Sequence, residues 1–506
     1  MAKSPEDLNT TLNNLNIAFQ QADFKTNKTK IYNVHVPPIP VQTKTTALEV
    51  VDVYYLVTTG VSLCMMEHSL VMSFTGILLP QLRKDTYMNV NERMESWIAS
   101  IGGISLFLGA LTTTFIMSRF GRRKVNLLCT IIMVVGWLSI ILAPDINTIL
   151  FGRFTQGIAL GISSLSASIL IGEYCSPKYR GGFLTKVSLT ISIGSLISHT
   201  LGSFLSWRST AAICLGITFI DLILIYISPE SPMFLATRGK YNECKKVFHW
   251  LRGLKENEEL EAMMNAEISR KETAKPPKTK QFANKISDMI VTMKDPQFFK
   301  PLFVMLHLDI VNIWSGGMMM DVYANRIYQK LMGNDTDVAS TIITVDCVKI
   351  VASLCAVFIH TKFKRRSMLI LLVSLNVITY FLIAGSCFLM DKGVIFFKNP
   401  LIGFLFVNFH AIISAVGAVP LANILAGEIL PLRYKAIESM ISILFLSVNV
   451  TIKMKTLPYL FSYIGLSGAY CFYGLILAYG MIVATVIMPE TKGKSLQEIR
   501  IEPHIS

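Results

Sequence analysis

Charge is scarce in this sequence. Only 16% of its 506 residues are charged, whereas soluble proteins carry about a quarter. Residues 1–48 are polar and contain no apolar run, so we expect no cleavable signal peptide. The nine cysteines follow no spacing typical of zinc sites or disulfide frameworks. No nucleotide-binding glycine loop, catalytic triad or metal-ligand cluster stands out. These absences argue against an enzyme and predict no cofactor and no metal.

Apolar residues, by contrast, make up 52% of the chain and gather in long runs. A run of about 20 apolar residues is long enough to cross a bilayer as a helix. The pattern predicts an all-α membrane protein with twelve transmembrane helices, at residues 54–80, 94–117, 124–143, 147–172, 183–205, 209–228, 301–328, 338–360, 367–390, 400–427, 436–460 and 467–488.

The polar stretches between these runs predict the domain organisation. Residues 229–300 are too polar to span and predict a cytosolic linker with short amphipathic helices, such as the one in "NECKKVFHWLRGL". The expected domains are therefore an N-terminal tail, an N-terminal six-helix half, the linker, a C-terminal six-helix half and a C-terminal tail, at 1–48, 49–228, 229–300, 301–488 and 489–506.

Basic residues are unevenly divided between the loops. If both termini lie on the inner side, the inner segments hold 35 Lys and Arg residues and the outer loops hold 8. Loops rich in Lys and Arg remain in the cytoplasm. We therefore predict a multi-pass plasma-membrane protein with both termini cytoplasmic. The excess of Lys and Arg in the inner segments also explains the net charge of +14, so no nucleic-acid partner is required.

Three short motifs each occur twice, in the same order. "SRFGRRK" (118–124) is matched by "TKFKRRS" (361–367), "GEYCSPKYRGG" (172–182) by "GEILPLRYKAI" (427–437), and Pro-Glu-Ser-Pro from Pro229 by Pro-Glu-Thr-Lys from Pro489. Each copy stands at the inner end of a predicted span. The repeats indicate two pseudo-symmetric six-helix halves of like topology.

These motifs resemble those of the sugar-porter branch of the major facilitator superfamily, over about residues 50–500. Within that branch the chain is most similar to insect facilitated trehalose transporters, through "LLPQL" (78–82), "STII" (340–343), "GEILPLR" (427–433) and "PETKGKSLQEI" (489–499). The resemblance implies a transporter that works by alternating access. Its markers are Arg119 with Gly121, Arg122 and Arg123; Gly152-Arg153 with Gly157; Glu173 with Arg180-Gly181; Trp207-Arg208; Pro229 to Pro232; and Pro489 to Gly493.

The resemblance implies a gating network of charged residues at the inner helix ends. Arg and Glu there can form charge-assisted hydrogen bonds between helices. An alternative is that these residues only set the topology. The family's aspartate before Arg119 is Ser118, and its arginine after Glu428 is Lys435, so we expect a looser inner gate. The candidates are Arg119, Arg122, Arg123, Arg153, Glu173, Arg180, Glu230, Glu428, Lys435 and Glu490.

The substrate pocket departs furthest from the family. Sugar porters bind hydroxyl groups with amide side chains, which offer both donors and an acceptor. Here the family's glutamine on the fifth span falls at Ser188, its asparagine on the eighth at Lys349, and its asparagine on the eleventh near Leu446. The candidate substrate-binding residues are Ser188, Asn312, Ser315, Tyr323, Lys349 and Asn423.

Ionisable residues lie inside several predicted spans, where charges are costly and usually face a cavity or a partner. One reading is a cavity tuned to a charged solute. The other is a set of internal pairs, and Asp346 and Lys349 are spaced i, i+3 so that they can neutralise each other. The full set is Glu67, His68, Asp221, Asp309, Asp321, Asp346, Lys349, Lys453 and Lys455.

The favoured function is facilitated movement of a sugar, with trehalose or a hexose implied by the resemblance. Proton-coupled relatives carry an aspartate on the first span where this chain has Phe74, which argues against proton coupling. The alternatives are a transporter of another small, charged solute and a non-transporting nutrient sensor. Asn334, in an outer loop, is a candidate glycosylation site because it begins an Asn-Asp-Thr sequon.

Overall fold

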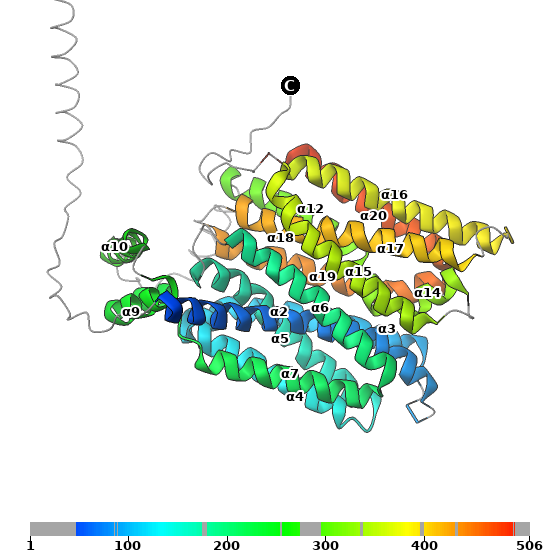
Figure 1. Ribbon diagram of the computed structural model, residues 1–506, viewed down its shortest axis with the longest axis horizontal. Helices are drawn as coiled ribbons and strands as arrows, with labels where there is room; N and C mark the ends of the chain where they lie inside the picture. Colours follow the sequence, from blue (N-terminus) through cyan, green and yellow to red (C-terminus); the bar gives the residue numbers. More distant parts are fainter. Residues whose placement is uncertain are drawn as a thin grey trace, which may run out of the picture. The chain divides into compact units, whose positions relative to one another are not determined.

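The computed structural model describes one compact unit within Ala47–Ser506. The described residues are 47–85, 87–88, 90–174, 180–253, 256–273, 295–333, 337–394, 399–430, 434–488 and 490. The candidate glycosylation site Asn334, the tail before residue 47 and the tail after residue 490 lie outside them. The described part is helical throughout (Figure 1).

The first six predicted spans are six long helices, which we call the N half. They are α2 (Ala47–Lys84), α3 (Glu92–Phe120), α4 (Arg122–Ile141), α5 (Ile146–Tyr174), α6 (Arg180–Phe204) and α7 (Trp207–Ile227). Small residues allow some of these helices to approach closely. A Cβ at Gly161 would strike the backbone of Leu106 and Ala110, so α3 and α5 pack at the distance that only glycine permits.

The last six predicted spans form the C half, and two of them are interrupted. The seventh is α12 (Pro296–Trp314), α13 (Gly317–Val322) and α14 (Ala324–Met332), and the tenth is α17 (Pro400–Val416) and α18 (Ala418–Ile429). The others are α15 (Val338–Lys362), α16 (Arg365–Asp391), α19 (Lys435–Tyr463) and α20 (Gly465–Ile487). All twelve predicted spans are therefore helical.

The lengths and surfaces of these helices fit a membrane. Within the described residues, 11 helical segments are long and apolar enough to cross a bilayer, and α5 is a further helix of 29 residues. Large apolar side chains cover the outside of the bundle, where water would disfavour them and lipid would not. Among the exposed ones are Phe115, Ile220, Ile223, Val351, Phe358, Leu371 and Leu475.

Short helices follow the N half, as the sequence predicts for the linker. They are α8 (Pro232–Thr237), α9 (Tyr241–Arg252) and α10 (Asn257–Thr273). Cys244 and Phe248 of α9 pack with Leu260 of α10 in a small core of their own. Burial raises the pKa of the Cys244 thiol to about 11.

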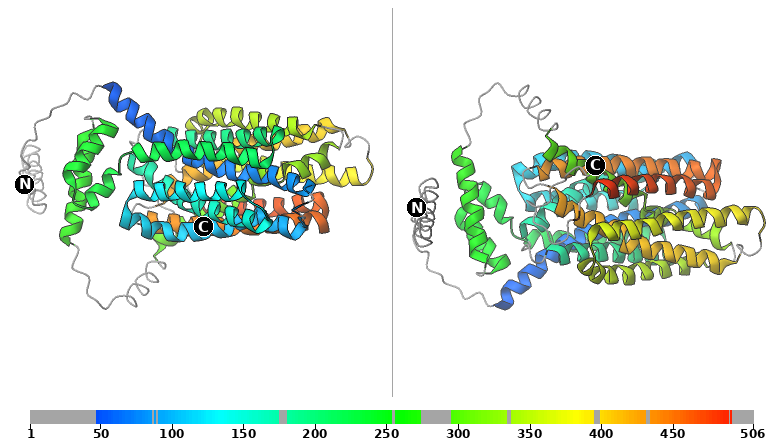
Figure 2. Two further views of the ribbon diagram at one scale, coloured as in Figure 1. Left: turned by 90° about the horizontal axis from the view of Figure 1, so that it is seen from below. Right: turned by 90° about the horizontal axis from the view of Figure 1, so that it is seen from above.

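We name the two ends of the bundle by what lies there. The linker end contains residues 118–124, 228–241, 362–366, 488 and 490, and α9 and α10 lie beside it (Figures 1 and 2). The loop end contains the described residues 85, 87–88, 90–91, 142–146, 205–206 and 464, which connect the helices. The most extensive contacts between the two halves pair α3 with α19, α6 with α15, and α2 with α13.

Candidate functional site

The charged residues at the linker end of the N half form a compact cluster. Arg122 at the start of α4 places its Nη2 atom 2.6 Å from Oε1 of Glu173 on α5. The Oε1 atom of Glu230 accepts hydrogen bonds from the backbone N–H groups of Arg122 (2.8 Å), Arg123 (3.2 Å) and Ser231 (2.9 Å). The Glu230 carboxylate thus caps the amino end of α4, where unpaired N–H groups and the helix dipole favour a negative charge.

The second copy of the Pro-Glu motif does the same in the C half. Oε1 of Glu490 accepts from the backbone N–H of Arg365 at 2.9 Å, and Oε2 accepts from that of Arg366 at 3.3 Å, at the start of α16. Glu230 and Glu490 therefore hold equivalent helices in the two halves. The repeated motif is explained by this shared cap.

Other predicted gating residues have different surroundings. The Arg123 side chain donates to the carbonyl of Tyr226. Arg119 is exposed, and its carbonyl accepts from Nη2 of Arg238 at 2.5 Å. Arg153 is buried in the N half, where Nη1 donates to the carbonyl of Val71 at 2.8 Å. The side chains of three further candidates lie outside the described part of the structure: Arg180, Glu428 and Lys435.

The seventh span breaks where the sequence reads Ser315-Gly316. Gly316 has φ +102°, a left-handed conformation that side chains with a Cβ rarely adopt. A Cβ there would meet the ring of His410 and, at 2.7 Å, Oη of Tyr380. The break leaves carbonyl groups at the end of α12 without the partners that a continuous helix would supply.

Side chains from two other helices pair with those carbonyls. Nζ of Lys453 on α19 donates to the Ile313 carbonyl at 2.6 Å, and Oη of Tyr380 on α16 donates to the Trp314 carbonyl at 2.8 Å. Nδ2 of Asn376 donates to the Ser315 carbonyl at 3.1 Å. A cation at the carboxyl end of a helix also complements the helix dipole. The buried lysine therefore has a structural role at the break.

Four ionisable side chains form a cluster that joins the two halves, which we call the ionic cluster. Nζ of Lys349 on α15 lies 2.6 Å from Oδ1 of Asp321 on α13 and 3.0 Å from Oδ1 of Asp346. Nδ1 of His199 on α6 lies 2.5 Å from Oδ2 of Asp346, and its Nε2 lies 3.2 Å from the backbone oxygen of Asp321. The predicted Asp346–Lys349 pair is confirmed, and His199 adds a partner from the N half.

Further contacts between the halves lie toward the loop end. Nδ2 of Asn325 on α14 donates to the carbonyl of Gly76 on α2 at 3.2 Å. Nζ of Lys455 on α19 donates to Oγ of Ser96 on α3 at 2.9 Å and lies 3.6 Å from the centre of the Trp97 ring. The halves are thus hydrogen-bonded together at the loop end.

The charged contacts at the linker end are arranged differently. On this side of the ionic cluster, hydrogen bonds between the halves include Thr114 to Sδ of Met440 at 3.6 Å and Ser192 with Ser353 at 3.1 Å. The Arg122–Glu173 pair and both Glu caps lie within a single half. These charged contacts therefore hold each half together at this end.

The remaining predicted substrate-binding residues are not all available to a solute. Oγ of Ser315 donates to the Asn312 carbonyl at 2.7 Å, and Oη of Tyr323 donates to the Met454 carbonyl at 3.4 Å; both residues are buried. Ser188 is buried on α6. Asn312 is partly exposed, on the last turn of α12 before the break. The side chain of Asn423 lies outside the described part of the structure.

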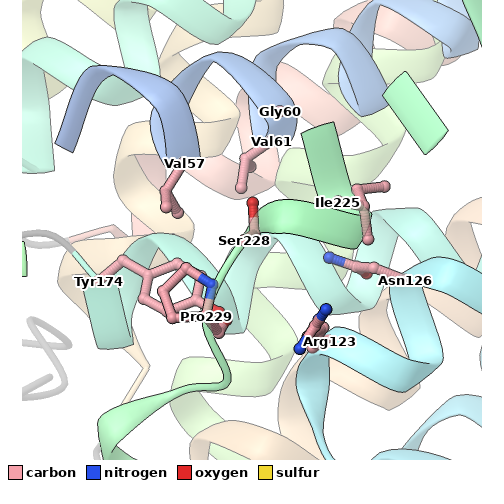
Figure 3. Close-up of a pocket in the computed structure, with 9 residues that line it drawn as sticks. All are labelled: Val57, Gly60, Val61, Arg123, Asn126, Tyr174, Ile225, Ser228 and Pro229. Carbon is pink, nitrogen blue, oxygen red and sulfur yellow. Dashed lines mark hydrogen bonds between the residues drawn. The ribbon is translucent and has the colours of Figure 1, made fainter. Parts of the chain in front are cut away.

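The linings of two pockets in the described residues include no member of the ionic cluster. One, at the linker end of the N half, is lined by α2, α4, α5, the last turn of α7 and the residues after it, with Asn126 and Arg123 facing Ser228 and Tyr174 (Figure 3). Its volume of about 20 Å³ holds a water molecule but not a sugar. The other, at the loop end between α2 and α14, has about 250 Å³ and is lined by Arg83, Lys84 and Arg326 among others.

Sequence reasoning missed several residues of this region. His199 lies 147 residues from Asp346, and no local pattern signals such a contact. On the eleventh span the amide is Asn449, three residues from the expected Leu446; its Oδ1 accepts from Nε1 of Trp314 at 3.0 Å. A gapless comparison cannot detect a shift of one helical turn. In the described residues no group of three or more His, Cys, Asp or Glu side chains could hold a metal.

Comparison with known proteins decides the family. The model of a family described as sugar (and other) transporter matches residues 60–502. The chain belongs to this family. Its members are transporters rather than enzymes, so the prediction of a multi-pass, non-enzymatic membrane protein of the sugar-porter group is confirmed.

Named relatives and solved structures agree with this assignment. The facilitated trehalose transporter Tret1 of Apis mellifera ligustica is 27% identical over 84% of this chain and 83% of its own. The Tret1-2 homolog of Drosophila simulans is 25% identical over 87% and 88%. The inward open xylose transporter XylE from E. coli aligns over 88% of this chain and 98% of its own, with a TM-score of 0.69 at 16% identity. This last likeness establishes the major facilitator fold.

Proposed function

We propose that the chain is a facilitative transporter of a neutral sugar, with trehalose or a hexose as the first candidates. The family match over residues 60–502 carries this proposal, because it covers both halves and the interface between them. The relatives named as facilitated trehalose transporters support the choice of substrate class.

The pairing of charges in the spans favours a neutral solute over a charged one. In the ionic cluster, Lys349 and His199 oppose the carboxylates of Asp321 and Asp346. Asp309 accepts a hydrogen bond from Oγ of Ser442 at 2.5 Å. Charges that are already paired do not need a charged ligand to stabilise them. The members of the ionic cluster and Asp309, which are among the side chains that prompted the charged-solute hypothesis, thus have partners within the protein.

We propose that transport proceeds by alternating access around the break in the seventh span. Discontinuous helices near the bilayer midplane are typical of transporter binding sites, because their freed backbone groups and nearby side chains can contact the solute. Asn312 is the candidate of choice for a sugar contact. Its amide offers two donors and an acceptor, and its side chain is partly exposed beside the break.

We further propose that the linker end faces the cytoplasm of a cell whose plasma membrane holds the protein. The excess of Lys and Arg at this end supports that orientation. The Arg122–Glu173 pair and the caps made by Glu230 and Glu490 would then keep each half rigid while the two halves rock against each other. In this view the gating residues act mainly within the halves.

Uptake of labelled sugars tests the proposed function. We would express the chain in oocytes, confirm its presence at the surface, and measure uptake of labelled trehalose and glucose. Saturable uptake that Asn312→Ala weakens, but Asn242→Ala does not, would support both the substrate class and the site. Asn242 is an exposed residue of α9 and serves as a matched control. No uptake of either sugar by protein at the surface would refute the assignment and revive the sensor or other-solute alternatives.

A further inference from the structure

The ionic cluster has a position that transport should disturb. His199 belongs to the N half, whereas Asp321, Asp346 and Lys349 belong to the C half. His199 is five residues from the loop-end terminus of α6, which ends at Phe204. If the loop end opens by separation of the halves, the contacts of His199 with the C half must break. The ionic cluster therefore links the two surfaces that separate when the loop end opens.

The geometry of His199 indicates its protonation state. Nδ1 faces a carboxylate oxygen of Asp346 at 2.5 Å, and Nε2 faces the backbone oxygen of Asp321 at 3.2 Å. Both neighbours are acceptors, so both ring nitrogens must carry a proton to make the two hydrogen bonds. The ring is then an imidazolium, and the cluster holds two positive and two negative charges.

We propose that His199 is a latch between the halves that closes the loop end when its ring is doubly protonated. Loss of one proton turns a hydrogen bond into a repulsive contact between two acceptors and leaves the cluster with a net negative charge. A buried, unbalanced charge is unfavourable. The latch is therefore strongest at low pH and weakens as the pH rises.

The pH dependence of the latch arises from charged groups of the C half. The charged groups that act on the ring are Asp346, Asp321 and Lys349, all from α13 and α15. On the other side, α2 contributes uncharged neighbours on the adjoining turns, because Ser73 bonds Ser195 and the carbonyl of Leu70 lies 3.4 Å from Oγ of Ser198.

A distance measurement across the loop end tests the latch. We would place spin labels at Leu205→Cys, after α6, and at Ser340→Cys on α15, because both positions are exposed and lie in different halves. Native cysteines that react with the label are replaced in the background. Double electron–electron resonance then reports the distribution of distances in nanodiscs between about pH 5.5 and about pH 8.5, a range in which histidine changes charge.

We expect a short distance at low pH and a growing longer population as the pH rises. His199→Asn should show the longer population at every pH, with the ratio of long to short distances raised about tenfold at low pH, the effect of losing a charge-assisted hydrogen bond. His307→Asn is the matched control, because that histidine contacts the Phe303 carbonyl and Tyr479 within the C half. The distribution of spin-label distances in His307→Asn should change with pH in the same way as in the spin-labelled protein that retains both histidines.

An unchanged distribution in His199→Asn, or equal pH dependence with and without His199, would overturn the proposal. If the single variant does not fold, the double variant His199→Asn with Asp346→Asn keeps the charges balanced. Its distances should not depend on pH, and persistent dependence would likewise refute the latch. The proposal rests on alternating access but not on the substrate. Because the distances are measured without solute, a failed sugar-uptake assay and a failed latch are distinguishable outcomes.

Discussion

Replacing Gly316 with alanine should be among the most damaging small changes in the C half. The glycine has φ +102° at the break between α12 and α13. A Cβ at this position would strike the ring of His410 and lie 2.7 Å from Oη of Tyr380. That hydroxyl donates to the Trp314 carbonyl at 2.8 Å, so moving it removes a partner from the end of α12.

The cost follows from two separate effects. A left-handed conformation costs a residue with a Cβ about 1–2 kcal/mol, and the lost buried hydrogen bond costs about 1–3 kcal/mol because the carbonyl remains unpaired. We expect Gly316→Ala to lower the free energy of unfolding by about 2–5 kcal/mol, the sum of these two ranges. Titration of the purified protein with SDS in mixed micelles measures it, and sugar uptake should fall with it.

Two glycines of the same half separate these effects. Gly333 has φ +86° but an added Cβ would meet nothing within 4 Å, so Gly333→Ala reports the backbone conformation alone. Gly385 lies within helix α16 in open space, so Gly385→Ala should stabilise the helix by about 0.5–1 kcal/mol. If Gly316→Ala costs no more than Gly333→Ala, the steric part of the reasoning is refuted.

Three further changes test other parts of the structure. Glu230→Gln removes the charge that caps α4 and should lower the free energy of unfolding by about 0.5–2 kcal/mol in the same titration. Glu243→Gln, at an exposed position of α9, should be nearly neutral, and equal losses would contradict the cap. Lys453→Met should lower the free energy of unfolding by about 1–3 kcal/mol because it leaves the buried Ile313 carbonyl unpaired. An unchanged or higher free energy of unfolding would show that burying the lysine destabilises the protein more than its hydrogen bond stabilises it. A variant that keeps Cys244 as its sole cysteine tests the raised pKa of about 11 of this thiol. Maleimide should label the folded protein slowly, label it faster as the pH rises, and label it rapidly in SDS. Rapid labelling of the folded protein would contradict the burial of Cys244.

The repeated motifs acquire a physical meaning only in the folded chain. From the sequence, Pro229-Glu230 and Pro489-Glu490 were evidence of duplication and candidate gating charges. In the structure both glutamates cap the amino end of a helix within their own half. The duplication was visible because motifs are local, but the role was not, because each cap joins residues more than 100 positions apart.

What the sequence determined by itself is the architecture: twelve apolar spans, two like halves, a polar linker with helices, and the family. Each of these rests on a local pattern of hydrophobicity or on a motif, and such patterns do not depend on the register between distant helices. The Asp346–Lys349 pair was predictable for the same reason, since its partners share one helix face.

Only the tertiary structure decided what the buried charges do. It placed His199 of one half against the carboxylates of the other, and it placed Lys453 at the carbonyls freed by the break in the seventh span. The helix rotation and depth that create these contacts arise from packing between helices. A charged residue in an apolar run shows that a partner must exist, but the packed bundle selects which one.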